Sequence, residues 1–352
     1  MKPTQLAGFT LIVAVLVLAV DFGFAYQGTQ AALLFTLAVF TALVHGSMAI
    51  VVVAELCQAK WIQPIKKYLL SVYPLFIPIA IMFLFQYPRY DTYYGDAHGY
   101  LTNWMNPFFY FGRNLAALLL SCFVGWKYAQ ESLSGGSKKA MYGVFYVLLF
   151  VITNSFIAFD WIMPLEYPWF STLYGGFFFI ESLFTGVITC SIICFFLYRR
   201  YGKEIPKAIQ KAQYDTGVLM FGFGILWCYL FFSQLIVIWY GNLPTEVIFF
   251  LRRVWGNPGH PSPYWPLSVA VVVINFLLPF TVLQFKRFKS NPKVLAPVGL
   301  MIFGGLLMER FIMIRPMVYI QPIALLLELV LVLTLFGVYL RSGGEREVSP
   351  TQ

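Results

Sequence analysis

Residues 30–57 read QAALLFTLAVFTALVHGSMAIVVVAELC, and this stretch decides the fold class. It contains no charged side chain before Glu55. About 20 apolar residues at 1.5 Å rise per residue span the ~30 Å hydrocarbon layer of a bilayer. The stretch therefore predicts a membrane-spanning helix.

Similar apolar runs, separated by short polar breaks, fill most of the remaining chain. Hydropathy predicts an all-α integral membrane protein with about ten transmembrane helices. The predicted spans are 6–24, 30–57, 68–87, 105–127, 140–163, 169–198, 216–240, 264–285, 294–314 and 318–340.

The composition of the 352 residues agrees, since 60% are hydrophobic and only 11% are charged. Soluble domains carry about 25% charged residues, so an ordinary cytosolic enzyme is excluded. The net charge of +9 comes from residues at the ends of the spans and does not indicate nucleic-acid binding. All five cysteines lie in apolar runs without CxxC spacing, which predicts no zinc or iron–sulfur site.

The distribution of basic residues predicts the orientation of the spans. Of the 24 Lys and Arg residues, 18 lie at one set of span ends. The other six are Arg89, Arg113, Arg252, Arg253, Arg310 and Arg315. Basic residues are enriched on the cytoplasmic side, so both termini are expected in the cytoplasm.

The polytopic membrane domain is expected to cover residues 1–341. If the first and last helices flank the rest, helices 2–5 (30–163) and 6–9 (169–314) form two four-helix bundles. Residues 342–352 are polar and are expected to form a mobile tail.

The two longest loops, 88–104 and 241–263, lie on the side with few basic residues. The sequence of the second loop predicts a short amphipathic helix, with Thr245 as its N-cap and Gly256 at its C-terminal end. Its Arg252, Arg253 and Trp255 are candidates for docking a partner subunit, and an interfacial aromatic belt is the alternative explanation for the aromatic residues.

A few polar residues are predicted to lie within the spans. A charge at the centre of a bilayer costs about 2.5–3.5 kcal/mol, so these residues need a partner, water or a function. Buried carboxyl groups often hold a proton, which suits proton transfer. The proton-transfer candidates are His45, Glu55, Asp160, Glu181, Thr185, Thr189 and Glu328.

Some of these residues also have structural explanations. His45 is equally explained as a neutral histidine bonded to a backbone carbonyl. Glu309 is expected to form an interfacial ion pair with Arg310 or Arg315. Asp21 is expected to be solvated near the lipid head groups.

The sequence offers no complete cofactor site. A bis-histidine haem needs two facing histidines within the membrane, and His98 and His260 fall in loops, which leaves only His45. Phosphate-binding glycine loops and nucleophile–base motifs are also missing. The chain must therefore transport something or serve partners that carry redox centres.

Two segments resemble a known family: FDWIMPLEYPWFSTLYG at residues 159–175 and WYGNLPTE at residues 239–246. Both resemble the membrane subunits of bacterial alternative complex III, a quinol:electron-acceptor oxidoreductase within the NrfD-like, or polysulfide-reductase membrane-anchor, family. The length and the second segment are more similar to the ActF type than to the longer ActC type. Ten helices with two internal four-helix bundles is that family's architecture, so the resemblance covers nearly the whole chain.

The resemblance implies a multi-pass subunit of the bacterial inner (cytoplasmic) membrane that supports menaquinol oxidation. Its implied partners are a paralogous NrfD-like subunit, an iron–sulfur subunit and multihaem cytochrome c subunits, which carry the cofactors. Of the proton-transfer candidates, only Asp160 lies within a matching segment and is carried over from the resemblance, and no quinone-binding residue is assigned.

The resulting hypothesis is two polar lines that conduct protons. Glu55 and His45 form the inner part of the first line and Asp160 its outer exit, while Glu181, Thr185 and Thr189 belong to the second. A proton-coupled secondary transporter and a purely structural anchor are the competing functions.

Overall fold

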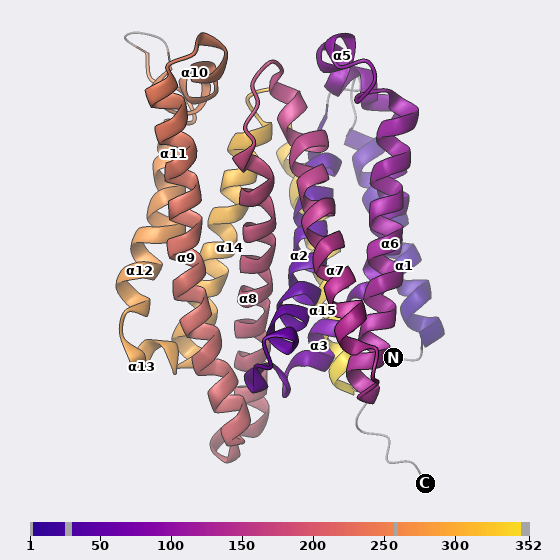
Figure 1. Cartoon of the computed structure of the whole chain (residues 1–352), viewed down its shortest axis with the longest axis vertical. Coiled ribbons are helices and arrows are strands. Elements are labelled where there is room, and N and C mark those ends of the chain that lie inside the picture. The colour runs from indigo at the N-terminus through magenta and orange to yellow at the C-terminus, as the bar shows by residue number, and fades with distance from the viewer. Residues whose placement is uncertain (1–2, 25–29, 257–259, 346–352) are drawn as a thin grey trace.

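The computed structural model describes residues 3–24, 30–256 and 260–345. Within them, ten helical segments are long and apolar enough to cross a membrane, as predicted, and they fit a multi-pass membrane protein (Figure 1). They are α1 (Pro3–Phe24), α2 (Ala32–Leu56), α3 (Lys66–Leu70) continued by α4 (Phe76–Leu84), α6 (Pro107–Ser134), α7 (Lys139–Phe156), α8 (Leu173–Tyr201), α9 (Lys207–Gly241), α11 (Trp265–Val272) continued by α12 (Leu278–Leu283), α14 (Pro292–Ile314) and α15 (Pro322–Glu345).

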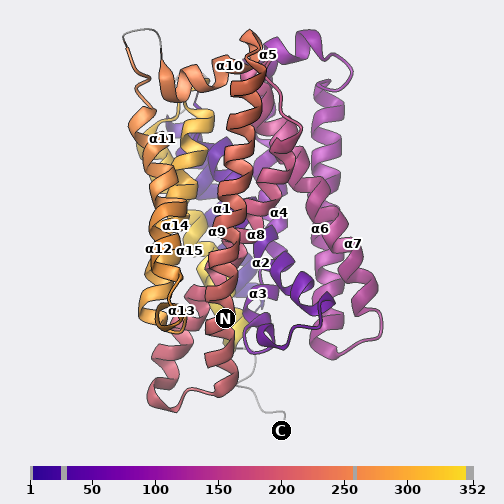
Figure 2. The ribbon, with the colours of Figure 1, turned by 60° about the vertical axis from the view of Figure 1, so that its left-hand side comes forward.

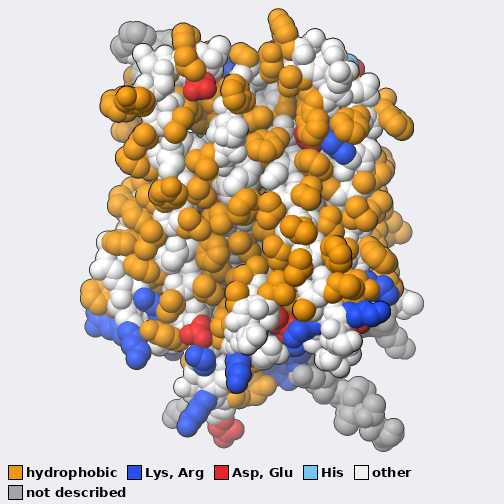
Figure 3. Space-filling view, in the orientation of Figure 1, with side chains coloured by type: hydrophobic (Ala, Val, Ile, Leu, Met, Phe, Trp, Pro, Cys, Tyr) orange, Lys and Arg blue, Asp and Glu red, His pale blue; other side chains and the backbone are white. Residues whose placement is uncertain are grey.

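The two ends of the bundle differ in charge. α1 begins and α15 ends at the same end, where lysine and arginine side chains gather along the lower edge of the molecule (Figures 1 and 3). We call this end the basic face. The short helices α5 (Tyr90–Tyr100) and α10 (Pro244–Phe250) lie at the other end, which we call the opposite face.

Helix α2 lies at the centre of the molecule and is buried along nearly its whole length. It packs against α4, α7, α8 and α15 (Figure 2). Its closest approach is to α8, because a Cβ atom at Gly46 would lie 1.7 Å from the carbonyl oxygen of Ser182. A Cβ atom at Gly186 would lie 2.2 Å from the carbonyl oxygen of Gly46. Glycine at both positions lets the two backbones touch, as small residues commonly do between membrane helices.

The other helices pack around this centre. On one side, α6 packs against α4 and α7. On the other side, α9 and α14 pack against α8, while α12 contacts α9 and α11 contacts α14. Helix α1 packs mainly against α15.

Several helices extend beyond the predicted spans on the basic face. α9 begins at Lys207 instead of residue 216, and α6 continues to Ser134 instead of residue 127. Hydropathy locates the part of a helix that lies in hydrocarbon, whereas backbone hydrogen bonding continues into water. α15 likewise runs through the start of the predicted tail to Glu345, and residues 346–352 lie outside the described residues.

The opposite face is more helical than predicted. The expected loop 88–104 contains α5. The predicted amphipathic helix is present as α10 with a wider, π-type turn at Leu251–Trp255, and Gly256, at φ +66°, ends it as expected. The predicted Thr245 cap is wrong, because the helix begins at Pro244 after Leu243 and has no side-chain cap.

Candidate functional site

Buried polar side chains follow one face of α6. Asn114, Ser121, Tyr128 and Ser132 are all buried and recur every four or seven residues, which places them on one side of a helix. From Asn114 to Ser132 the helix rises about 27 Å at 1.5 Å per residue, close to the thickness of the hydrocarbon layer. This face provides polar groups at several depths between the two faces of the bundle.

Near the opposite face this line ends at Asp160, which is fully buried where α7 widens into a π-type turn. Its Oδ2 atom pairs with Arg113 Nε at 2.9 Å and accepts a bond from Asn114 Nδ2 at 2.8 Å. Its Oδ1 atom accepts a bond from Trp104 Nε1 at 2.9 Å. The Arg113 guanidinium lies over the Trp104 ring, 4.1 Å from its centroid, so these two side chains cover the carboxylate.

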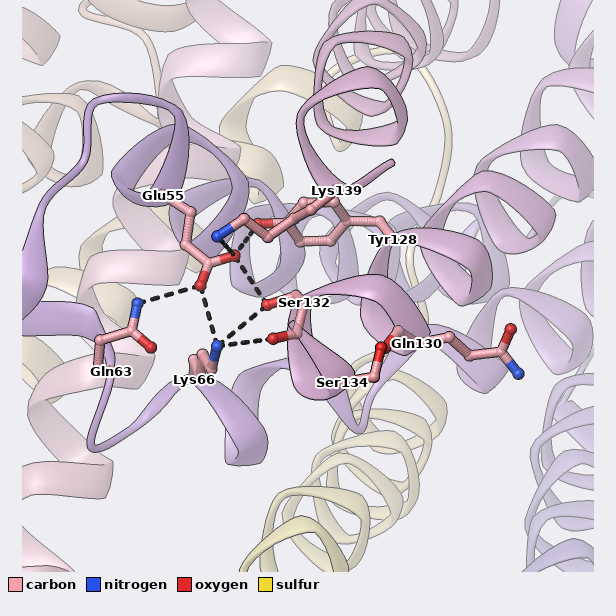
Figure 4. A network of polar contacts seen from close by, with 8 residues as sticks. All are labelled: Glu55, Gln63, Lys66, Tyr128, Gln130, Ser132, Ser134 and Lys139. Carbon is pink, nitrogen blue, oxygen red and sulfur yellow. Dashed lines mark hydrogen bonds and ion pairs between the residues drawn. The ribbon is translucent and has the colours of Figure 1, made fainter. Parts of the chain in front are cut away.

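Near the basic face the line ends at Glu55 (Figure 4). One carboxylate oxygen accepts bonds from Tyr128 and Ser132 at 2.7 Å each. The other pairs with Lys66 at 3.0 Å and accepts a bond from Gln63 at 3.1 Å. Lys139 Nζ lies 3.7 Å from the first oxygen. Charge-assisted bonds of this kind hold Glu55 as a carboxylate and tie α2 to α3, α6 and α7.

His45 lies between these two ends and is fully buried. Its ring packs against those of Phe76 and Phe150, with centroids 4.5 and 5.7 Å away. Its Nδ1 atom is 3.4 Å from the Tyr146 hydroxyl, and its Nε2 atom has no partner within the described chain. The interpretation of His45 as bonded to a backbone carbonyl is therefore wrong, since among the described residues the ring bonds only the Tyr146 phenol.

Ser121 and Ser182, which the sequence did not single out, complete this line with Thr153 and Asn154 of α7. Ser121 and Thr153 hydroxyls lie 3.3 Å apart, between α6 and α7. Ser182 on α8 donates to Asn154 on α7 at 2.5 Å. The three-and-four-residue recurrence of small and polar side chains along α6 was the available signal.

A second polar cluster joins α8, α9 and α14. Glu181 forms an ion pair with Arg310, whose guanidinium lies over the Phe178 ring. Glu309 lies beside Glu181 and accepts a bond from Trp227 Nε1 at 3.0 Å. All these polar side chains are buried. The expected ion pair of Glu309 with Arg310 or Arg315 is wrong, because Arg310 pairs with Glu181 instead and no ion pair joins Glu309 to Arg315 among the described residues.

Among the described residues, the two acids of this cluster have one ion pair between them, Glu181–Arg310. Each of Glu181 and Glu309 has an Oε1 atom without a hydrogen-bond partner among the described residues. Two carboxylates beside one guanidinium would leave an uncompensated negative charge in the interior, which is costly. A single proton between the two carboxyl groups removes that charge. A cavity of about 20 Å³, room for one water molecule, adjoins Glu181, Thr185 and Arg310.

The hydroxyls of Thr185 and Thr189 are bonded to helix backbone. The Thr185 hydroxyl lies within hydrogen-bond distance of two carbonyl oxygens, that of Ala42 at 3.0 Å and that of Ser182 at 2.7 Å. Thr189 donates to the carbonyl oxygen of Thr185 at 2.9 Å. Both lie on the same face of α8 as Glu181, as predicted from spacing.

Asp21 and Glu328 lie in a third polar region, where α1, α2 and α15 meet. Asp21 is fully buried and pairs with Arg89 at 2.6 Å, so the expectation that it is solvated is wrong. Glu328 is also fully buried, and both of its carboxyl oxygens lack a hydrogen-bond partner among the described residues. Thr36 and the Asp21–Arg89 pair are its polar neighbours.

The phenol of Tyr93, on α5, closes this region from the opposite face. It donates a hydrogen bond to the carbonyl oxygen of Gln30. Burial raises the pKa of Tyr93 well above its usual value, so the phenol remains a neutral donor.

The three candidates for partner docking differ in accessibility. The Arg253 side chain is only 4% exposed, pairs with Glu166 at 2.7 Å and donates to the carbonyl oxygens of Phe249, Ile312 and Met313. It holds the α10 segment onto α14 and presents no surface to a partner. Arg252 pairs with the same carboxylate at 3.2 Å with 39% of its side chain exposed, and Trp255 is exposed.

Neither the protein-family models nor the curated proteins with which the sequence was compared match this chain.

Proposed function

We propose that this chain is a membrane subunit of a quinol:electron-acceptor oxidoreductase of the alternative complex III type, and that it conducts protons. The observation that carries the proposal is the carboxyl pair of Glu181 and Glu309 beside the single guanidinium of Arg310. Charge balance requires one proton on that pair. A proton-conducting subunit requires groups that hold a proton between its membrane helices, whereas a structural anchor does not require them.

The site is divided between two four-helix bundles, residues 30–163 and 169–314. Mutual packing of α2, α4, α6 and α7 supports the first bundle, and packing of α8, α9, α11–α12 and α14 supports the second. The α6 line belongs to the first bundle and the carboxyl pair to the second. The Ser182–Asn154 hydrogen bond connects the α8 segment that carries Glu181 with α7.

In the first bundle a proton would pass along hydroxyl, imidazole and carboxylate groups. From the basic face they occur as the pairs Glu55–Tyr128, Tyr146–His45 and Ser121–Thr153, and they end at the Asp160 carboxylate, to which Asn114 donates a hydrogen bond. Hydroxyl and imidazole groups both donate and accept hydrogen bonds, so each can relay a proton. Water molecules would bridge the gaps between successive pairs.

We assign the basic face to the cytoplasm of a bacterial cell, because basic residues are retained on that side of the inner membrane. Both termini then lie in the cytoplasm. The resemblance supplies the partners: haem c and iron–sulfur subunits at the opposite face and a paralogous NrfD-like subunit in the membrane. Exposed Arg252 and Trp255 are the surface through which we expect the peripheral subunits to dock.

A proton-coupled secondary transporter is less well supported. Such proteins bind solute at helices that are interrupted at matching places in two repeats. Here the third span is interrupted between α3 and α4, but its counterpart α9 runs without a break from Lys207 to Gly241. A transporter would also purify without haem c or iron–sulfur partners.

The proposal is tested by purifying the tagged chain from its native membranes and measuring quinol-driven turnover and proton release. We expect haem c and iron–sulfur subunits to co-purify. Asp160→Asn and Glu181→Gln should slow turnover or proton release while the complex still assembles, and Glu131→Gln, at the basic end of α6, is the matched control. Normal turnover and proton stoichiometry in both variants would refute proton conduction, and purification without redox partners would refute the complex.

A further inference from the structure

The basic face contains a groove that belongs to none of the three polar regions described above. It lies between α8, α15 and α3 and has a volume of about 700 Å³. Volumes of about 300–1,000 Å³ are typical of ligand sites. Ile192 and Phe196 of α8 and Gly337 and Leu340 of α15 form its apolar walls. A Cβ atom at Gly337 would meet no atom within 4 Å, so the groove is open there.

Both walls end in an arginine. Arg200 follows Phe196 by four residues, and Arg341 follows Gly337 by four residues. Four residues of helix rise about 6 Å, and α8 and α15 both run toward the basic face. Arg200 and Arg341 therefore lie about one helical turn nearer the basic face than Phe196 and Gly337. An apolar groove with a cationic end matches the shape of a lipid.

Helix α3 forms the basic end of the groove. Tyr68 and Arg200 both line it, and Lys67 is close to Arg200. Among the described residues no carboxylate forms an ion pair with Arg200. α3 is fixed against α15, because the Ser71 hydroxyl donates to the carbonyl oxygen of Tyr339 at 2.7 Å. The cationic end is thus built on a firmly packed element.

We propose that this groove binds one anionic phospholipid, with its phosphate on Arg200 and Arg341 and an acyl chain along Ile192, Phe196 and Gly337. Guanidinium groups bind phosphate oxygens through two parallel hydrogen bonds. Several neighbouring cations repel the amine of a zwitterionic head group and favour a lipid with net negative charge. Basic pockets between membrane helices on the cytoplasmic side are sites of this kind.

The test measures lipid bound to the purified complex by native mass spectrometry, after delipidation and addition of phosphatidylglycerol or phosphatidylethanolamine. We expect phosphatidylglycerol to bind selectively. The double variant Arg200→Gln, Arg341→Gln should weaken phosphatidylglycerol binding by about tenfold or more, because at least one charge-assisted contact to the phosphate is lost. The control Arg199→Gln, Arg287→Gln removes the same charge from the same face outside the groove and should bind normally.

A second variant tests the apolar wall without changing charge. Gly337→Phe fills the open groove and should also weaken phosphatidylglycerol binding, whereas Gly304→Phe, at another open glycine on α14, should not. Equal binding of the two lipids, or normal binding by both groove variants, would overturn the assignment. Binding of inorganic phosphate as tightly as the lipid would overturn it as well, and so would cross-linking of a Gly337→Cys variant to another protein instead of lipid.

Discussion

Gly46 on α2 lies so close to Gly186 on α8 that the Gly46 carbonyl group occupies the place where Gly186 would carry a Cβ atom, while the Ser182 carbonyl occupies the corresponding place at Gly46. This contact fixes the central crossing of the molecule and sets the positions of His45 and Thr185, the residues next to the two glycines.

Because no space exists for a methyl group at this crossing, Gly46→Ala should force α2 and α8 apart. Overpacking of this kind costs about 1–3 kcal/mol. Thermal unfolding in detergent should show a clearly lower midpoint for Gly46→Ala than for Gly304→Ala, where a Cβ atom meets nothing within 4 Å. Equal midpoints would contradict the close crossing.

The Glu55 cluster predicts a large loss of stability on neutralisation. Glu55→Gln removes the charge that Lys66 and Lys139 face and weakens the bonds from Tyr128 and Ser132. Bonds to charged groups contribute about 1.5–3 kcal/mol each, so we expect a loss of at least that size. Asp215→Asn, which breaks the exposed Lys211–Asp215 pair, should cost no more than about 0.5 kcal/mol. Comparable losses in chemical unfolding would contradict this difference.

Substitution of His45 should affect proton release but not the stability of the fold. Its Nε2 atom is buried without a partner and its ring packs against Phe76 and Phe150, so His45→Phe should change the free energy of unfolding by less than about 1 kcal/mol. The variant has no titratable ring, so quinol-driven proton release should slow. His98→Phe, on α5, is the control. A stable variant with normal proton release would remove His45 from the path.

Arg252 and Arg253 pair with the same carboxylate but should respond differently to substitution. Arg253→Gln leaves Glu166 and three backbone carbonyls without their buried partner, and such losses cost about 3–5 kcal/mol. Arg252→Gln removes a pair that is partly in solvent and should cost about 1 kcal/mol or less. We expect Arg252→Gln instead to weaken co-purification of the peripheral subunits. The reverse order of stabilities would contradict the geometry.

The sequence predicted what depends on one helix at a time. The apolar runs marked ten spans, and the spacing of Glu181, Thr185 and Thr189 placed them on one face of α8. Both follow from the length and period of a helix.

The sequence did not predict contacts between helices that are far apart in the chain. Glu309 was expected to pair with Arg310 or Arg315, but Arg310 pairs with Glu181, 129 residues away. Adjacent helix residues diverge by about 100°, so Glu309 points to Trp227 and Arg310 to α8. Asp21 was mistaken for a solvated residue because its partner Arg89 lies in a segment expected to be a loop.

The most direct test of proton storage is infrared spectroscopy of the carboxyl pair in the purified complex. The C=O stretching band of a protonated carboxylic acid should be present at neutral pH, because Glu181 and Glu309 share one cation. Glu309→Gln should remove the part of this band that arises from the Glu181–Glu309 pair and should leave the Glu181–Arg310 ion pair intact. It should also slow proton release. An unchanged carboxylic acid band in Glu309→Gln, together with normal proton release, would contradict a stored proton at this site.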